Sequence, residues 1–235
     1  MPRTPGTTRA CPLCMAVRAR QPKPSPEEVP GAESFLPEQH TLPALRAAIP
    51  TCRGCTLYKE ATQAVFGEGS SASKVMLIGE VPGDYEDLAG KPFVGPSGKL
   101  LDEALALAGI PRNEVYVTNA VKHFKFTRRG KRRLHDKPNR YEITACKPWL
   151  ESELEVIEPE IVVLLGATAA QALLGSSFRV TKSRGQALET ELAKWTFATV
   201  HPAAVLRAPD EEMRRIAKEE FIADFDIVGE YFKKL

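Results

Sequence analysis

Four short runs rich in apolar residues recur along this chain. They are KVMLIGE (74–80), EVYVTNAV (114–121), EIVVLLGA (160–167) and TFATVHP (196–202). Apolar runs of this length are typical of parallel strands, because such strands are covered on both faces of the sheet.

The segments around these runs have apolar residues at helical spacing. The helical patterns lie at 42–49, 97–108, 141–157, 167–174 and 210–232. Strands that alternate with helices predict an α/β fold: a three-layer α/β/α sandwich around a mostly parallel four-stranded sheet.

The chain divides by composition near residue 40. Its 235 residues, 43% of them hydrophobic, are enough for one globular domain, which we expect over 41–235. Residues 1–40 hold eight of the 19 prolines and one aromatic residue, Phe35. Such a segment buries too little apolar surface to offset its ordering entropy, so we predict a disordered tail.

The chain has no apolar run of 18 residues, and its first residues have no apolar signal core. We therefore expect a cytoplasmic protein without a membrane partner, and a monomer. The formal net charge of +2 is too small to attract nucleic acid as a whole. Any such affinity has to come from local clusters of charge.

One strongly basic stretch provides such a cluster. Residues 122–140, KHFKFTRRGKRRLHDKPNR, hold nine of the 32 lysines and arginines and a single acidic residue, Asp136. Gly130 and Pro138 argue against one continuous helix. We predict a basic loop that contacts phosphates; a solvated run of charge is the alternative.

Polar segments follow three of the apolar runs. They are GEVPGDYEDLAGKPFVGPSGK after the first, TNAVKH at the second and HPAAVLR at the last. Because ligands of open α/β sheets bind beyond the carboxyl ends of the strands, we expect the three segments to line one crevice. The segment FVGPSGKL lacks the first glycine and the Ser/Thr of a phosphate-binding P-loop, and no G-x-G-x-x-G opens a helix.

These three segments resemble the motifs of the family 4-like branch of the uracil-DNA glycosylase superfamily, over about residues 44–230. In addition, KRRLH at 131–135 resembles the K-R-R-I-H loop of the UdgX type, whose histidine becomes covalently attached to DNA after uracil leaves. The resemblance implies a DNA-repair glycosylase that acts on uracil-containing DNA, preferably single-stranded, and ends linked through His135 to C1′ of the abasic site. Two alternatives are a hydrolytic glycosylase that turns over and a non-catalytic iron-sulfur protein that binds nucleic acid.

Three side chains are suited to holding a base that has left the stack. Phe93 offers a stacking face, and the Asn119 amide matches O4 and N3–H of uracil. His201 can donate to O2 as negative charge develops on the leaving base. The alternative is that the three residues have structural roles: Phe93 as a core residue, Asn119 as a strand-end cap and His201 as a buried structural histidine.

Carboxylates crowd the exit of the first strand. By resemblance, Glu80 lies against His135 and activates it, Asp84 orients the attacking group or water, and Glu86 fills the slot that rejects the thymine methyl group. Asp87 is a candidate helix cap, and Val81 replaces the usual glutamine of the motif. The predicted DNA contacts are Lys131, Arg132, Arg133 and Arg207.

The five cysteines include two C-x-x-C pairs, a spacing that favours metal or redox chemistry in a reducing compartment. Cys11 and Cys14 are candidates for half of a zinc site. The resemblance implies a [4Fe-4S] cluster held by Cys52, Cys55, His123 and Cys146, since imidazole also ligates iron in such clusters. Zinc suits the same set of three cysteines and one histidine.

Overall fold

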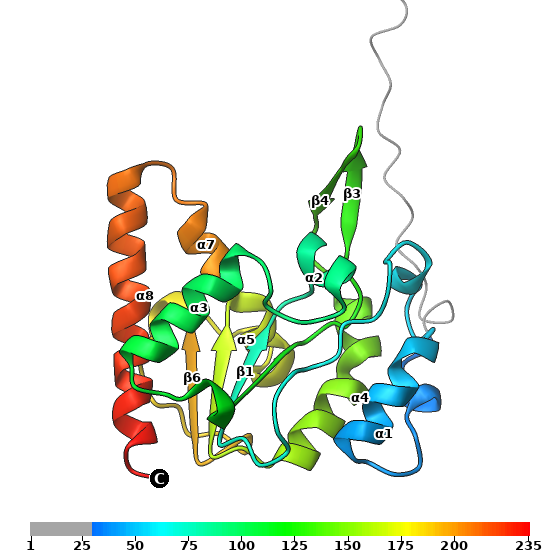
Figure 1. Ribbon diagram of the computed structural model, residues 1–235, viewed down its shortest axis with the longest axis horizontal. Coiled ribbons are helices and arrows are strands. Elements are labelled where there is room, and N and C mark those ends of the chain that lie inside the picture. The colour runs from blue at the N-terminus through cyan, green and yellow to red at the C-terminus, as the bar shows by residue number, and fades with distance from the viewer. Residues whose placement is uncertain (1–29) are drawn as a thin grey trace, which may run out of the picture.

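The central sheet has four parallel strands, in the order β2-β1-β5-β6 (Figure 1). The computed structural model describes residues 30–235, so most of the expected tail, with Cys11 and Cys14, lies outside the described residues. The strands are β1 (Val75–Gly79), β2 (Val115–Asn119), β5 (Ile161–Leu165) and β6 (Trp195–Thr199). All four predicted strands are confirmed: each begins within one residue of the start of its apolar run and ends within three residues of the end of that run.

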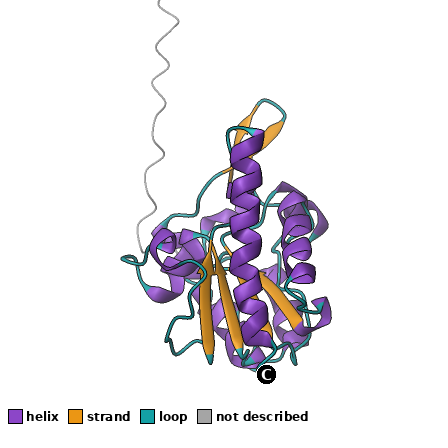
Figure 2. Cartoon of the chain, turned by 90° about the vertical axis from the view of Figure 1, so that its left-hand side faces the viewer, coloured by secondary structure: helices purple, strands orange, loops and turns teal. Residues whose placement is uncertain are grey.

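Helices cover both faces of this sheet (Figure 2). Met76 and Ile78 of β1 face a core shared with α1 (Leu42–Ala48), α4 (Arg140–Ile157) and α5 (Ala167–Leu174). The alternate residues Val75 and Leu77 face a second core with α3 (Pro96–Leu107), α7 (Pro202–Leu206) and α8 (Glu211–Phe232). Since successive side chains of a strand point to opposite faces, this division confirms the three-layer α/β/α sandwich.

Short elements complete the fold and were absent from the prediction. They are the helices α2 (Asp84–Ala89) and α6 (Val180–Ser183) and the 3-10 turns Glu33–Phe35, Ile49–Thr51, Thr56–Lys59 and Arg112–Glu114; α7 was also not expected. Elements of one or two turns carry too few residues for a periodic pattern. Within residues 30–235, no helix is both long and apolar enough to cross a membrane.

The predicted basic loop is in fact an ordered hairpin. Strands β3 (Phe126–Arg129) and β4 (Arg132–His135) pair antiparallel, with Arg129 opposite Arg132 and Phe126 opposite His135. Gly130 has a φ of 59° in the two-residue turn, a conformation that glycine adopts at little cost. The hairpin projects from the end of the sheet to which the strand arrows point (Figure 1).

The packed part of the chain begins earlier than the expected boundary at residue 41. Ala32 is fully buried, and its N–H donates to the carbonyl of Ala145 at 2.8 Å; Gly31 donates to Gly54 at 3.0 Å. Phe35 and Leu36 also pack against the core. Composition could not reveal this attachment, because it depends on a few side chains and two backbone hydrogen bonds in a segment rich in proline.

Candidate active site

A cavity of about 300 Å³ lies at the carboxyl ends of β1 and β2, next to the start of α7. Its walls come from all three polar segments and from the end of the hairpin. They include every predicted catalytic and base-contacting residue, with Arg207: Glu80, Asp84, Glu86, Phe93, Asn119, His135 and His201. The structure thus brings together residues separated by up to 127 positions, as the topology of a parallel sheet predicts.

One wall of the cavity is shaped around Phe93 and Asn119. Asn119 ends β2 opposite Gly79 of β1 and is buried. A Cβ atom on Gly79 would lie 2.4 Å from Asn119 Oδ1 and 2.7 Å from the Phe93 ring. The glycine therefore lets an aromatic face and an amide approach each other, while the Phe93 ring stacks with His201 at a centroid distance of 6.1 Å.

His201 is held as a neutral imidazole. Its Nδ1 accepts a hydrogen bond of 3.2 Å from the N–H of Ala203 at the start of α7, which assigns the ring proton to Nε2. Burial, with smaller contributions from the neighbouring His135 and Arg207, lowers the pKa of His201 to about 4. At neutral pH the Nε2–H is consequently available as a donor.

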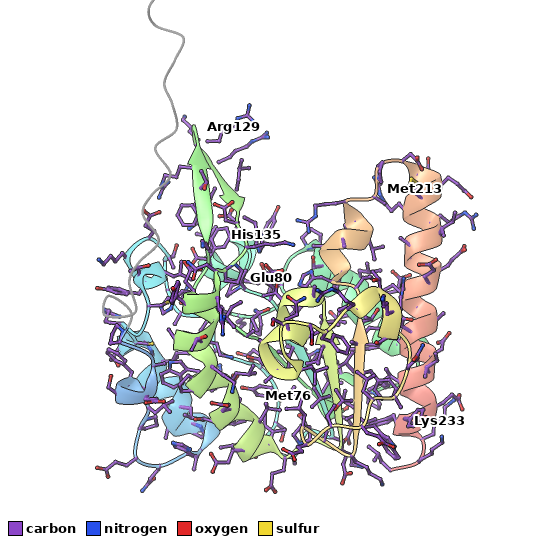
Figure 3. All side chains as sticks on the ribbon, turned by 180° about the vertical axis from the view of Figure 1, so that it is seen from behind. Met76, Glu80, Arg129, His135, Met213 and Lys233 are labelled. Carbon is purple, nitrogen blue, oxygen red and sulfur yellow. The ribbon has the colours of Figure 1, made fainter. Side chains whose placement is uncertain are left out.

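His135 stands at the mouth of the cavity, at the end of β4, and remains exposed to solvent. The protein around its ring lowers the pKa of His135, mainly by desolvation and also through Arg207, while Glu80 acts in the opposite direction. Glu80 Oε1 is buried and has no hydrogen-bond partner among the described residues. Figure 3 shows both side chains where the hairpin meets the sheet.

Arg133 occupies a different place from the one predicted. Its Nε donates to Asp84 at 2.6 Å, and its Nη1 donates to Asp87 at 2.5 Å. The guanidinium also lies over the rings of Phe124 and Phe126, at 5.3 and 5.2 Å. Arg133 is therefore an internal anchor of the hairpin, which corrects its assignment as a phosphate contact.

The two carboxylates bound by Arg133 also differ from expectation. Asp87 is fully buried and accepts from the N–H of Thr62 at 2.9 Å, so it ties α2 to a neighbouring loop and to the hairpin and does not act as a helix cap. Asp84 still lines the cavity, but one of its oxygens is occupied by Arg133.

Glu86 connects two segments of the cavity wall through hydrogen bonds. Its Oε1 accepts from the N–H of Gly95 at 2.8 Å, and its Oε2 accepts from the N–H of Gly83 at 3.1 Å. The carboxylate thereby fixes two loops relative to each other. Its predicted role against the thymine methyl group stays a prediction.

The remaining cations divide into two groups. Lys131 and Arg132 are exposed on the hairpin and line, with Arg128, a second hollow of about 600 Å³ beside Leu88 and Leu134. Other cations of the same stretch face inward: Lys122 is fully buried, and Lys125 pairs with Glu142 at 2.8 Å. Only part of the basic stretch is thus free to meet phosphates.

Cys52, Cys55 and Cys146 are buried free thiols that gather beside α4. Trp149 Nε1–H donates to Cys52 Sγ, and the N–H of Lys122 donates to Cys146 Sγ, both at 3.2 Å. Burial raises the pKa of Cys55 to about 11. It raises the pKa of Cys146 well above its usual range, with Lys122 opposing and Cys55 and Cys52 reinforcing the rise.

His123 is the predicted fourth ligand. His123 is buried, and burial lowers its pKa to about 4, assisted by Arg53 and opposed by Asp87. Across residues 30–235, no three or more His, Cys, Asp or Glu side chains are arranged to hold a metal ion. The structure therefore gathers the three cysteines but does not form the expected four-ligand set.

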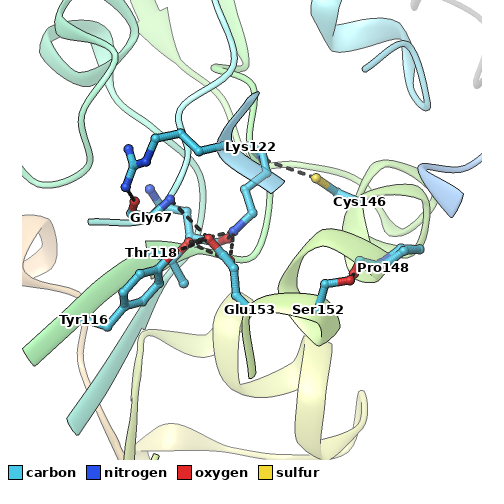
Figure 4. A network of polar contacts seen from close by, with 10 residues as sticks. Gly67, Tyr116, Thr118, Lys122, Cys146, Pro148, Ser152 and Glu153 are labelled. Atoms are coloured by element: carbon cyan, nitrogen blue, oxygen red, sulfur yellow. Dashed lines mark hydrogen bonds and ion pairs between the residues drawn. The ribbon is translucent and has the colours of Figure 1, made fainter. Parts of the chain in front are cut away.

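A buried ion pair behind the cavity was not expected from the sequence. Lys122 and Glu153 meet in a network with Tyr116 and Thr118 (Figure 4). The available signal was a glutamate seven residues after Cys146 on the apolar face of α4, where a charge requires a partner.

The comparisons with known proteins agree with this arrangement. The sequence model described as the Uracil DNA glycosylase superfamily matches residues 66–226. The type-4 uracil-DNA glycosylase of Sulfurisphaera tokodaii is 36% identical over 191 residues, which cover 77% of this chain and 82% of that protein. The type-4 uracil-DNA glycosylase of Thermotoga maritima is 37% identical over 173 residues, which cover 73% of this chain and 86% of that protein. The type-4 enzyme of Pyrobaculum aerophilum is 38% identical over 179 residues, which cover 72% of this chain and 86% of that protein. The chain therefore belongs to the uracil-DNA glycosylase superfamily, with type-4 enzymes among its relatives.

Proposed function

We propose that this protein excises uracil from DNA and then remains covalently attached, through His135, to C1′ of the abasic site. The observation that carries the proposal is the position of His135. An ordered hairpin places its imidazole at the mouth of the same cavity that holds Phe93, Asn119 and His201.

Excision begins when uracil leaves the base stack and enters the cavity. Phe93 stacks on the base, and the Asn119 amide pairs with its O4 and N3–H. As the bond between C1′ and N1 breaks, its electron pair passes to the base and leaves an oxocarbenium-like sugar. His201 Nε2–H donates to O2 of the departing anion, and one such donor is worth about 3 kcal/mol of transition-state stabilisation.

The sugar cation is then captured by an imidazole nitrogen. The lowered pKa of His135 favours its neutral form at pH 7, with a lone pair available. That lone pair forms the new N–C1′ bond, and the imidazolium passes its remaining N–H proton to Glu80 or to solvent. The carboxylate of Glu80 also offsets positive charge on the ring and the sugar.

The hairpin favours the adduct over hydrolysis in a second way. Asp84 is the residue expected to orient water, yet Arg133 of the same hairpin engages its carboxylate at 2.6 Å. The element that delivers His135 thereby restrains the carboxylate on which the hydrolytic alternative depends.

The DNA contacts in this proposal are electrostatic. Lys131, Arg132 and Arg207 are exposed around the cavity and the second hollow, where they would neutralise phosphates without reading sequence. We expect single-stranded DNA to be preferred, since extruding an unpaired base costs less than breaking a base pair.

A [4Fe-4S] cluster held by Cys52, Cys55, Cys146 and His123 is part of the proposal. Its support is the chemistry of the donors: three buried thiols, two N–H groups directed at sulfur, and a neutral imidazole next to Lys122. The bound group would cross-link α4, the C-x-x-C segment and the loop after β2. Zinc in the same place is the alternative.

Incubation with end-labelled single-stranded uracil DNA, followed by a denaturing gel, separates the candidate functions. We expect a slow band that survives heat and detergent. Free abasic DNA without that band would replace the proposal with hydrolytic turnover, and unchanged DNA would indicate a protein that only binds nucleic acid.

A further inference from the structure

The ion pair behind the cavity is sealed from water. Lys122 and Glu153 are each 0% exposed, and the Lys122 ammonium has three partners: Glu153, Thr118 Oγ1 at 2.6 Å and the carbonyl oxygen of Asn119 at 2.8 Å. Each of its three protons can therefore be directed at an oxygen.

Glu153 is equally well satisfied. Its Oε1 accepts from the Tyr116 hydroxyl at 2.8 Å and from the N–H of Gly67 at 3.1 Å, and its Oε2 lies 3.0 Å from Thr118 Oγ1. Burial, with Glu153 itself, raises the pKa of Tyr116, so that hydroxyl stays protonated and donates.

The ion pair joins three parts of the fold (Figure 4). Glu153 belongs to α4, Thr118 and Asn119 end β2, and Lys122 belongs to the loop that follows β2. Removing two charges from water is costly, and an apolar pair of similar volume is often at least as stable. Stability alone is therefore a weak reason for a buried ion pair at this position. A role in holding a neighbouring residue in place explains it better.

Asn119 is the residue held most directly. Its carbonyl accepts from Lys122, while its side-chain Oδ1 lies against Gly79 and the Phe93 ring in the cavity wall. We infer that Lys122 and Glu153 are positioning residues that fix the Asn119 carboxamide for base recognition. This inference rests on the proposed excision of uracil.

The test uses the double variant Lys122→Met, Glu153→Gln. The glutamine keeps an acceptor for Tyr116 and Gly67, while the donor to Asn119 and both charges are lost, so no unpaired buried charge remains. We expect single-turnover uracil release to slow by roughly 10- to 100-fold, as for small misplacements of a contact group, with the affinity for uncleavable DNA unchanged. In an Asn119→Ala background the same double change should slow release no further.

Tyr116→Phe is the matched control, because it removes a hydrogen bond to the same carboxylate without touching Asn119. It should lower the melting temperature but leave uracil release within about threefold of wild type. If the double variant melts below the assay temperature, Thr118→Val is used in its place. This change removes one hydrogen-bond partner of Lys122 and should also slow uracil release.

Four results would overturn the inference. The first three are wild-type release by the folded double variant, equal slowing by Tyr116→Phe, and further slowing in the Asn119→Ala background. The fourth is loss, together with activity, of the absorbance expected at about 400 nm from the proposed iron-sulfur cluster, which would assign the pair to the cysteine site. A wild-type protein that released no uracil would instead refute the proposed function.

Discussion

Two histidines line the cavity, and their surroundings suit them to different tasks. His201 caps the start of α7 by accepting a hydrogen bond at Nδ1, so its Nε2–H remains as the donor. His135 stands at the mouth of the cavity, close enough for Glu80 and Arg207 to act on its pKa in opposite directions. In the mechanism we propose, leaving-group stabilisation therefore falls to His201 and nucleophilic capture to His135.

The pKa of His201 has a consequence for stability. Its folded value of about 4 lies below the usual 6.5, so the unfolded chain binds more protons between these limits, and stability must fall as the pH falls through this window. Between pH 7 and pH 5 we expect a loss of about 2 kcal/mol from this residue. Urea unfolding of His201→Gln should show a loss smaller by that amount, and an identical loss in both proteins would contradict the pKa.

Asn119→Ala tests whether the Asn119 side chain recognises the base. The cavity loses the amide that we propose to pair with the base, whereas the hairpin keeps the cations that we propose to contact phosphates. Uracil release should fall by at least 100-fold in single-turnover assays, with non-specific DNA affinity measured by fluorescence anisotropy unchanged. Lys131→Ala is the complementary control. It should weaken DNA binding but leave the rate of uracil release from bound DNA unchanged. Parallel loss of both properties in Asn119→Ala would make the residue structural.

At the scale of elements, the hairpin is where the sequence was least informative. The sequence showed its basic composition, and Gly130 and Pro138 argued against one continuous helix, but the hairpin itself was not predicted. The anchor could not be predicted, because the partners of Arg133 lie 46 and 49 residues earlier in the chain and are defined only once α2 packs beside β4. From sequence alone, any lysine or arginine of this stretch is predicted to contact DNA; only the folded structure shows which of them are paired with carboxylates.

Arg133→Lys tests the anchor. A lysine keeps the charge but cannot bind Asp84 and Asp87 with a planar fork. We expect covalent adduct to form at least 10-fold more slowly, and abasic product to rise as Asp84 is freed to orient water. Both products are quantified on one denaturing gel. Arg129→Lys, at the hairpin tip shown in Figure 3, should behave as wild type. Unchanged adduct formation in Arg133→Lys would mean that the hairpin is held in place by other contacts.

For the whole molecule, the apolar runs and the helical spacing of apolar residues were enough to predict the four strands of the central sheet, five of the helices and the convergence of three motifs on one edge of the sheet. The buried runs of β1, β2, β5 and β6 admit few alternatives. What the sequence could not supply were contacts set by tertiary packing, such as the pairing of Lys122 with Glu153 and the attachment of Ala32. Short α2 and α7 also depend on caps rather than on a period.

The cysteine site yields a prediction for the protein as a whole. Purified anaerobically, it should be brown, with broad absorption near about 400 nm from sulfur-to-iron charge transfer. Cys146→Ser should lose this absorption and much of its iron, because it removes one of the three thiols that we propose as cluster ligands. Metal analysis that finds zinc and no iron in the wild type would favour the alternative metal.

Mass spectrometry of the protein after reaction with a short uracil-containing oligonucleotide tests directly whether His135 becomes attached to DNA. We expect an intact mass equal to protein plus oligonucleotide minus uracil, with the added mass on the peptide that contains His135. His135→Ser should show no such species, and abasic DNA should instead accumulate over several turnovers, because Asn119 and His201 still assist bond cleavage while water reaches C1′. An adduct located on another residue, or one that persists undiminished in His135→Ser, would contradict the account.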